Sequence, residues 1–205
     1  MIAHSFNSHR RAATAETRQK ILQGAFRALS RKGYEHTTVK DIAEEAGVAQ
    51  GLVNYHFKSK QGLVMAVLAM CCAEMQQSGG DDAIAGALDA FQQFKGVLRS
   101  RRDVHRLYIQ LIGVGLHDAE VGAGILEDMR QNRGNVEAIA REVLAQSGQP
   151  PELAPAAAAA VWGATLGIMI QTLIDRDFDA AAAIDALAAM VIAAANHPEY
   201  LARRG

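Results

Sequence analysis

The 205-residue sequence is poor in cysteine and proline, and it has no run with strand-like alternation. The only two cysteines, Cys71 and Cys72, are adjacent, and neighbouring side chains on a helix seldom form a disulfide. All four prolines lie at or after position 150, and apolar residues recur at helical spacing. We therefore expect an all-α protein without a disulfide framework, in a reducing compartment such as the cytoplasm.

Signals for export or membrane insertion are also lacking. Residues 1–14 hold no apolar core segment, so Arg10 and Arg11 do not resemble a twin-arginine signal. Residues 153–174 carry no charge and are long enough to span a bilayer. They are mostly Ala and Gly, however, and their flanks, Glu152 and Asp175, provide no basic anchor. We expect a helix buried in protein and no membrane partner.

Motifs that carry enzyme chemistry are absent as well. The sequence has no Walker loop, no His-Glu-x-x-His pair, no nucleophile elbow and no Cys/His cluster with metal-ligand spacing. The acid pairs Glu44-Glu45 and Asp81-Asp82 are most simply solvated. We expect no catalytic residue, no metal and no cofactor, although a helical enzyme or a helical interaction protein without DNA binding remains an alternative at this point.

Charge is distributed unevenly along the chain, although the formal net charge is only −1. Residues 1–60 contain ten Lys/Arg against five Asp/Glu, whereas residues 61–205 contain eleven against seventeen. This asymmetry is typical of a basic region that contacts phosphate joined to an acidic body. A chance fluctuation in surface charge is the alternative.

Apolar periodicity and turn signals predict a succession of helices. The first is expected at 15–32, with Thr14 as a possible cap and Gly33 at its end. Thr38 and Asp41 form a capping-box pattern for a short second helix that ends at Gly47. A Gly-Gly-Asp-Asp break is expected at 79–82, and a second break at 147–151. The other helices are expected at about 50–57, from 61 to the first break, and at 83–99, 104–116, 122–147, 151–174 and 180–196.

Two short helices joined by a glycine turn form the helix-turn-helix plan, in which the second helix enters the major groove. The segments GYEHTTVKDIAEEAGV (33–48) and GLVNYHFKSK (51–60) closely resemble the TetR family of repressors. The resemblance covers about residues 15–65. It implies a three-helix DNA-binding domain at 1–60 and a larger helical ligand-binding and dimerisation domain at 61–205. It also implies a ligand-responsive regulator, most simply a repressor that a small-molecule effector releases from a palindromic operator.

The resemblance also assigns DNA contacts, and the chemistry of the residues agrees with them. Gln or Asn can pair with adenine, and Leu can pack on a thymine methyl. Val48, Val53 and Phe57 are expected in the core. Asn54 replaces the family's usual tyrosine and Ala49 its usual Ser/Thr cap, so the operator sequence cannot be predicted. The expected contacts are Thr38, Tyr55, His56 and Lys60 to phosphate, Arg10 and Arg11 as a flexible basic arm, and Gln50, Gly51, Leu52 and Asn54 in the groove.

The last two helices are expected to form a homodimer. Ala159, Gly163 and Gly167 share one helix face, which permits close helix approach. An apolar stripe on the final helix would complete a four-helix contact between two protomers. Packing within one protomer is the alternative for both faces. The residues of the final stripe are Ile184, Leu187, Val191 and Ile192.

Effectors of this family are held among the middle helices, so apolar residues with a few polar atoms are the candidates there. Each of them could equally be plain core. Cys71 and Cys72 are expected to be buried apolar residues rather than a metal or redox sensor. The effector, the operator and the regulated genes are not encoded in any recognisable pattern. The candidate ligand residues are Phe91, Phe94, His105, Tyr108, Met129, Trp162, Thr165 and Met169.

Overall fold

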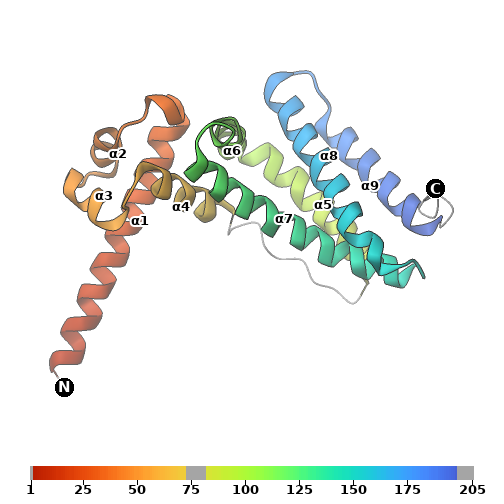
Figure 1. Ribbon diagram of the computed structural model, residues 1–205, viewed down its shortest axis with the longest axis horizontal. Helices are drawn as coiled ribbons and strands as arrows, with labels where there is room; N and C mark the ends of the chain where they lie inside the picture. The colour runs from red at the N-terminus through yellow and green to blue at the C-terminus, as the bar shows by residue number, and fades with distance from the viewer. Residues whose placement is uncertain (1, 73–81, 198–205) are drawn as a thin grey trace. The chain divides into compact units, whose positions relative to one another are not determined.

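The computed structural model describes residues 2–72 and 82–197, with side chains from residue 12 to 71 and from 82 to 197. The described residues contain helices and no strand, which confirms the predicted all-α class. Figure 1 shows these elements in chain order. They are α1 (Ile2–His36), α2 (Val39–Ala46), α3 (Gln50–His56), α4 (Lys60–Cys72), α5 (Ala83–Ser100), α6 (Arg102–Gly115), α7 (Ala119–Gln146), the short 3₁₀ helix η2 (Pro151–Leu153), α8 (Ala154–Ile174) and α9 (Ala180–Asn196).

By packing, the chain divides into two compact units. The first contains residues 1–75 and 106–125, and therefore α1 to α4, most of α6 and the start of α7. The second contains residues 76–105 and 126–205, and therefore α5, most of α7, α8 and α9. The predicted boundary after residue 60 separates a DNA-binding domain from a ligand-binding and dimerisation domain. It is a functional boundary, which the packing units do not test, and it stays a prediction.

The first helix is longer than the sequence pattern predicted. It begins at Ile2 rather than near residue 15, so Thr14 lies inside the helix and is not its cap. The segment around Thr14 is rich in alanine, which favours continuation of a helix. Gly33 interrupts the helix with φ 76° and ψ 169°, as its predicted terminating role requires, and one more helical turn follows to His36. The predicted break at 79–82 lies outside the described residues except for Asp82, which caps α5.

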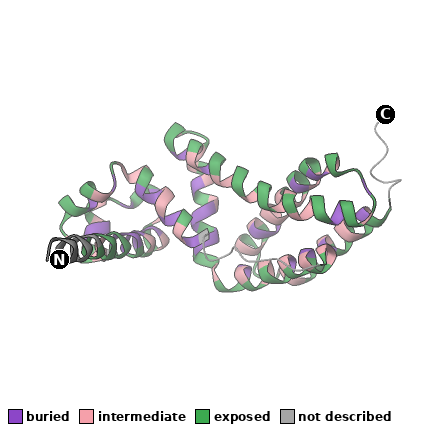
Figure 2. Ribbon diagram, turned by 90° about the horizontal axis from the view of Figure 1, so that it is seen from below, coloured by how far each residue is buried: buried purple, intermediate pink, exposed green. Residues whose placement is uncertain are grey.

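The core of the first unit forms where α2 and α4 pack on α1. On α1, Ile21, Leu22 and Leu29 are buried, whereas Phe26 is half-buried. Helix α1 approaches α2 so closely that a Cβ on Gly24 would lie 2.6 Å from the Cβ of Ala46. Buried and exposed residues lie side by side along the helices, as amphipathic packing requires (Figure 2).

In the second unit α9 packs against both α8 and α5. At one end Ala87 of α5, Val143 of α7 and Ala195 of α9 form a buried cluster. The segment Pro151–Ile174 is long and apolar enough to cross a membrane by length and composition alone, and 22% of its most apolar window is buried. The prediction of a helix buried in protein is therefore met in part by a single chain, because most of the larger apolar side chains of α8 are half-buried and Ile174 is 79% exposed.

Candidate nucleic-acid interface

Helix α2, its glycine turn and helix α3 form the predicted helix-turn-helix. The Thr38 hydroxyl accepts a hydrogen bond from the Asp41 N–H at 3.1 Å, and the Asp41 carboxylate accepts one from the Thr38 N–H at 2.8 Å. This is the capping box that the sequence predicted. Gly47 adopts the left-handed conformation at φ 67° and ends α2. Helix α3 then begins at Gln50, and Ala49 before it provides no side-chain cap.

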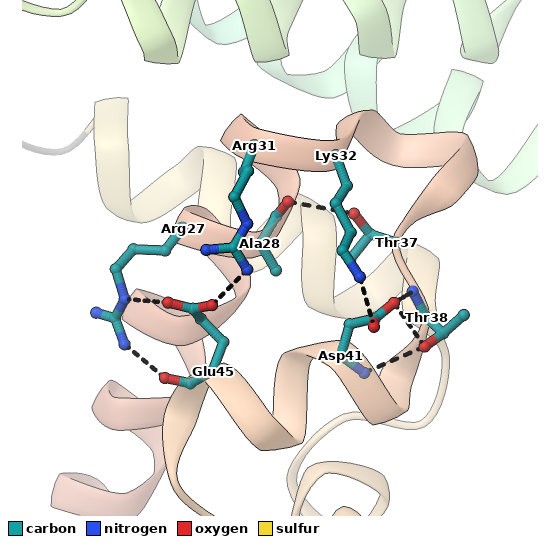
Figure 3. A network of polar contacts seen from close by, with 8 residues as sticks. All are labelled: Arg27, Ala28, Arg31, Lys32, Thr37, Thr38, Asp41 and Glu45. Atoms are coloured by element: carbon teal, nitrogen blue, oxygen red, sulfur yellow. Dashed lines mark hydrogen bonds and ion pairs between the residues drawn. The ribbon is translucent and has the colours of Figure 1, made fainter.

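A network of ion pairs fastens α2 to α1 (Figure 3). Lys32 bonds to Asp41 at 2.7 Å, next to the capping box. At the other end of α2, Arg31 and Arg27 bond to the two carboxylate oxygens of Glu45 at 2.6 and 3.1 Å. Arg27 also donates to the Glu45 backbone carbonyl at 2.7 Å. The interpretation of Glu45 as merely solvated is therefore wrong, because partners 14 and 18 residues earlier in the chain bind it.

These contacts keep both carboxyl groups ionised. The hydrogen bond from Lys32, followed by those from Thr38, lowers the pKa of Asp41 far below its ordinary value. Hydrogen bonds from Arg31 and then Arg27 lower the pKa of Glu45. Two negative charges on α2 thus pair with three positive charges on α1, and these contacts hold α2 on α1 at two points one helical turn apart.

Helix α3 turns its predicted core residues inward and its predicted groove residues outward. Val53 and Phe57 are 1% and 8% exposed, which confirms them as core, whereas Val48 is only half-buried. Among the described residues outside α3 itself, none lies within 4 Å of a Cβ built on Gly51, so this face of α3 is open. An exposed helix face of this kind can enter the major groove of DNA, which is wide enough to admit an α-helix. The exposed residues are Gln50, Gly51, Leu52, Asn54 and Tyr55, with Leu52 42% and Tyr55 74% exposed.

The residues predicted to contact phosphate differ in their exposure and in the contacts that they already make within the chain. Thr38 is exposed, but its hydroxyl takes part in the capping box. His56 is half-buried beside the Tyr55 ring, with the ring centroids 5.3 Å apart. The Lys60 ammonium donates to the Tyr34 carbonyl oxygen and lies 4.2 Å from the Tyr34 ring centroid. The partial burial of the Lys60 ammonium lowers its pKa. Their contact with phosphate stays a prediction.

Two basic features near this surface depart from the sequence analysis. The backbone of Arg10 and Arg11 belongs to α1, so the prediction of a flexible arm is wrong, and their side chains lie outside those described. Lys40 on α2 and Lys58 after α3 are exposed and were not singled out as contacts. The positive charge of residues 1–60 was the only sequence signal for them.

The eight candidate ligand residues are distributed over both units. Tyr108 belongs to the first unit and the other seven to the second. Within the second unit, His105 Nδ1 and Trp162 Nε1 are buried without a hydrogen-bond partner among the described residues. Burial, followed by the Arg101 charge, lowers the pKa of His105. Phe91, His105, Tyr108 and Met169 are buried, and Phe94, Met129, Trp162 and Thr165 are half-buried.

The predicted dimer residues fall into two groups. Ala159 and Gly163 are exposed, and no described residue outside α8 lies within 4 Å of a Cβ built on Gly163 or Gly167. On α9, by contrast, Ile184 is fully buried within the protomer, so its assignment to the interface is wrong. The other stripe residues, Leu187, Val191 and Ile192, are half-buried, and Met190, which the sequence analysis did not name, is 62% exposed.

No cluster of three or more His, Cys, Asp or Glu residues suited to a metal occurs in the part of the chain that the structure describes. Cys71 is buried, as expected of a small apolar residue, and the Cys72 side chain lies outside the described ones.

Comparison with known proteins agrees with this geometry. Residues 21–67 match the family described as bacterial regulatory proteins, tetR family. The uncharacterized HTH-type transcriptional regulator YvkB of Bacillus subtilis is 41% identical over 69 residues, which cover 32% of this chain and 36% of that protein. A putative TetR-family regulator from Rhodococcus sp. superposes with a TM-score of 0.72 at 20% identity, covering 86% of this chain and 97% of the other. The regulator FadR of Bacillus subtilis, solved in complex with stearoyl-CoA, gives 0.63 at 17% identity, covering 85% and 97%.

The fold and the α2–turn–α3 surface define an all-α protein with a helix-turn-helix near its N-terminus. Its N-terminal segment, residues 21–67, matches the tetR family of bacterial regulatory proteins. The matched segment spans only about a third of the length of the curated Bacillus relative, and the solved structures, at 20% identity or less, establish the fold alone.

Proposed function

We propose that this chain is a transcriptional repressor that binds a palindromic operator as a homodimer and releases it when a small-molecule effector binds. One observation carries the DNA-binding part. Helix α3 exposes Gln50, Leu52 and Asn54 while Val53 and Phe57 anchor it in the core. A short helix held this way on a capped α2 presents hydrogen-bonding side chains to a major groove.

The ion-pair network supports the same function. A recognition helix must keep one orientation, because a small tilt would move its side chains away from the base edges. Glu45, Arg27 and Arg31 fix the end of α2 from which the turn to α3 departs. Lys40, Lys58 and Tyr55 are exposed around this surface and are suited to phosphate oxygens, together with the predicted Thr38, His56 and Lys60.

The homodimer is supported by the open apolar face of α8. Ile174 is 79% exposed, and Gly163 and Gly167 leave room for the backbone of another helix. A soluble chain seldom leaves such a face uncovered, and a two-fold contact would cover it on both protomers. We also propose a cytoplasmic location, because the dimer would cover the apolar face of α8 with protein rather than with lipid.

The effector site is supported by two buried nitrogen atoms. His105 Nδ1 and Trp162 Nε1 have no partner among the described residues, and leaving a buried polar group unsatisfied costs about 1–3 kcal/mol. A ligand or water that bonds them would remove that cost. The FadR structure was solved with an acyl-CoA, so we propose an effector that combines a long apolar part with polar groups.

The experiment is a fluorescence-anisotropy titration of the full chain on DNA from upstream of its own gene, with random DNA of equal length. We expect the upstream DNA to bind more tightly, by about 10³-fold or more at physiological salt. An acyl-CoA should weaken operator binding, and by linkage the operator should weaken acyl-CoA binding by the same factor. Equal affinity for upstream and random DNA would contradict the proposal.

A further inference from the structure

The second unit contains a cavity of about 260 Å³ between α5, the start of α6, α8 and α9 that none of the candidate ligand residues lines. Three basic side chains, Lys95, Arg99 and Arg102, line it, and no acidic side chain does. Its apolar wall includes Leu98 and Ile184, which are 4% and 0% exposed. Lys95 is half-buried and Arg99 and Arg102 are exposed, so the basic side of the cavity is accessible to a ligand from solvent.

The three cations are only partly compensated by the chain. Lys95, whose side chain is 16% exposed, forms an ion pair with Asp185 of α9. Arg102 donates to the Leu173 carbonyl oxygen at 2.9 Å, which uses one of its five N–H donors. Arg99 makes no hydrogen bond or ion pair with the described residues. Two of the three charges therefore lack a carboxylate partner.

Backbone and hydroxyl groups add to the polar side of the cavity. Helix α9 starts beside it, and Ala180 and Ala181 line it. In the first turn of α9 the N–H groups of Ala180, Ala182 and Ala183 all have acceptors, whereas that of Ala181 has none among the described residues. A free N–H at a helix N-terminus attracts an anion. Thr172 donates its hydroxyl to Ile168, so its oxygen can still accept a hydrogen bond.

We propose that this cavity binds a small organic carboxylate, with the carboxylate bonded by Arg99 and Arg102 and a short apolar body packed on the half-buried Ala180 and Ala181. Guanidinium groups match the two oxygens of a carboxylate in a bidentate geometry. The volume is at the small end of ligand pockets, which suits a molecule of metabolite size rather than a long acyl chain. The site is separate from the proposed effector residues, and its test involves no DNA, so the two proposals fail independently.

The probe is sodium hexanoate, titrated into the full chain by isothermal titration calorimetry, with 1-hexanol and inorganic phosphate as comparisons. We expect hexanoate to bind and both comparisons to bind at least about ten-fold more weakly. Arg99→Gln should raise the hexanoate Kd about ten-fold, because it removes one charged hydrogen-bond donor without breaking any bond within the chain. Arg133→Gln, at an exposed position of α7, is the matched control and should leave the Kd unchanged.

A second variant tests the same site in the opposite direction. Asp185→Asn removes the carboxylate that competes for Lys95, so it should tighten hexanoate binding several-fold. The proposal is overturned if hexanoate fails to bind at about 10 mM, if hexanol or phosphate binds equally well, or if Arg99→Gln leaves the Kd unchanged.

Discussion

The Lys60 ammonium, at the start of α4, donates a hydrogen bond to the backbone carbonyl oxygen of Tyr34 and lies over the Tyr34 ring. Tyr34 follows the Gly33 break near the end of α1, and Lys60 is the first residue of α4, which comes after the recognition helix α3. The contact therefore ties the start of α4 to the end of α1. An ammonium group has three donors, and one of them is used here. The same side chain can therefore stabilise the fold and contact a phosphate.

Lys60→Met is expected to lower the free energy of unfolding by about 1 kcal/mol. This value is smaller than that of a fully buried charged hydrogen bond because the Lys60 side chain is partly exposed to solvent. The variant should also weaken binding to operator and random DNA alike, and lower the salt slope by about two for a dimer. Urea unfolding and salt titrations measure the two effects. Lys58→Met, at an exposed neighbouring position, is the control for stability. If both variants unfold alike, the Tyr34 contact contributes nothing.

The contacts of Glu45 predict a pH dependence of stability. Its pKa is lowered from an ordinary value of 4.5 in the folded chain, so in acid the unfolded chain binds more protons than the folded chain. The stabilisation is therefore complete above about pH 5.5 and is lost as the pH falls through 4.5 toward the lowered pKa. Glu45→Gln should be less stable at pH 7, and its stability should fall less steeply below pH 5. Parallel curves of the midpoint temperature against pH for the two proteins would show that the Arg27 and Arg31 contacts do not stabilise the fold.

Gly24 is expected to tolerate no side chain. A Cβ there would lie 2.6 Å from the Ala46 Cβ and 2.7 Å from the Ala46 backbone nitrogen, and backbone cannot yield cheaply. Gly24→Ala should destabilise the chain by about 1–3 kcal/mol despite the higher helix propensity of alanine. Gly134→Ala, on an exposed part of α7 with nothing within 4 Å, should instead stabilise it by about 0.5–1 kcal/mol. Thermal unfolding of both variants checks this, and equal stabilisation would refute the close approach of α1 and α2.

Gly167→Leu tests the dimer face of α8. No described residue outside α8 lies within 4 Å of a Cβ at this position, so a larger side chain should clash in the proposed helix–helix contact rather than within the protomer. We expect monomers in light scattering, helical content like that of the wild type, and reduced operator affinity because one half-site binds weakly. A dimeric Gly167→Leu protein with full affinity would remove this face from the interface. Gly134→Leu is the size-matched control.

The features that the sequence predicted well are local ones. The Thr38–Asp41 capping box, the Gly47 turn and the inward positions of Val53 and Phe57 depend on residues within one or two helical turns of each other. Caps and apolar spacing report such short-range physics directly. The bounds of α9 were correct for the same reason.

What the sequence missed depends on contacts between distant segments. Glu45 finds its partners on α1, and Lys60 finds the Tyr34 carbonyl 26 residues away, and neither pairing leaves a pattern in the chain. Ile184 has the spacing of an interface residue, yet it is buried in the protomer. The early start of α1 was missed because the polar N-terminal residues show no apolar stripe, although nothing in them breaks a helix.

The central claim, that α3 reads DNA sequence, is tested most directly by Asn54→Ala in binding titrations over salt. The DNA would be the operator, an operator with one base pair changed in each half-site, and random DNA. Asn54 is exposed, uncharged and one helical turn after Gln50, so it should contribute to base selectivity rather than to phosphate binding. We expect an unchanged salt slope and a loss of about 1–3 kcal/mol of discrimination at one base pair per half-site. If Asn54→Ala weakens binding to all three DNAs equally, or changes none of them, this residue does not read bases and the assigned orientation of α3 in the groove is wrong.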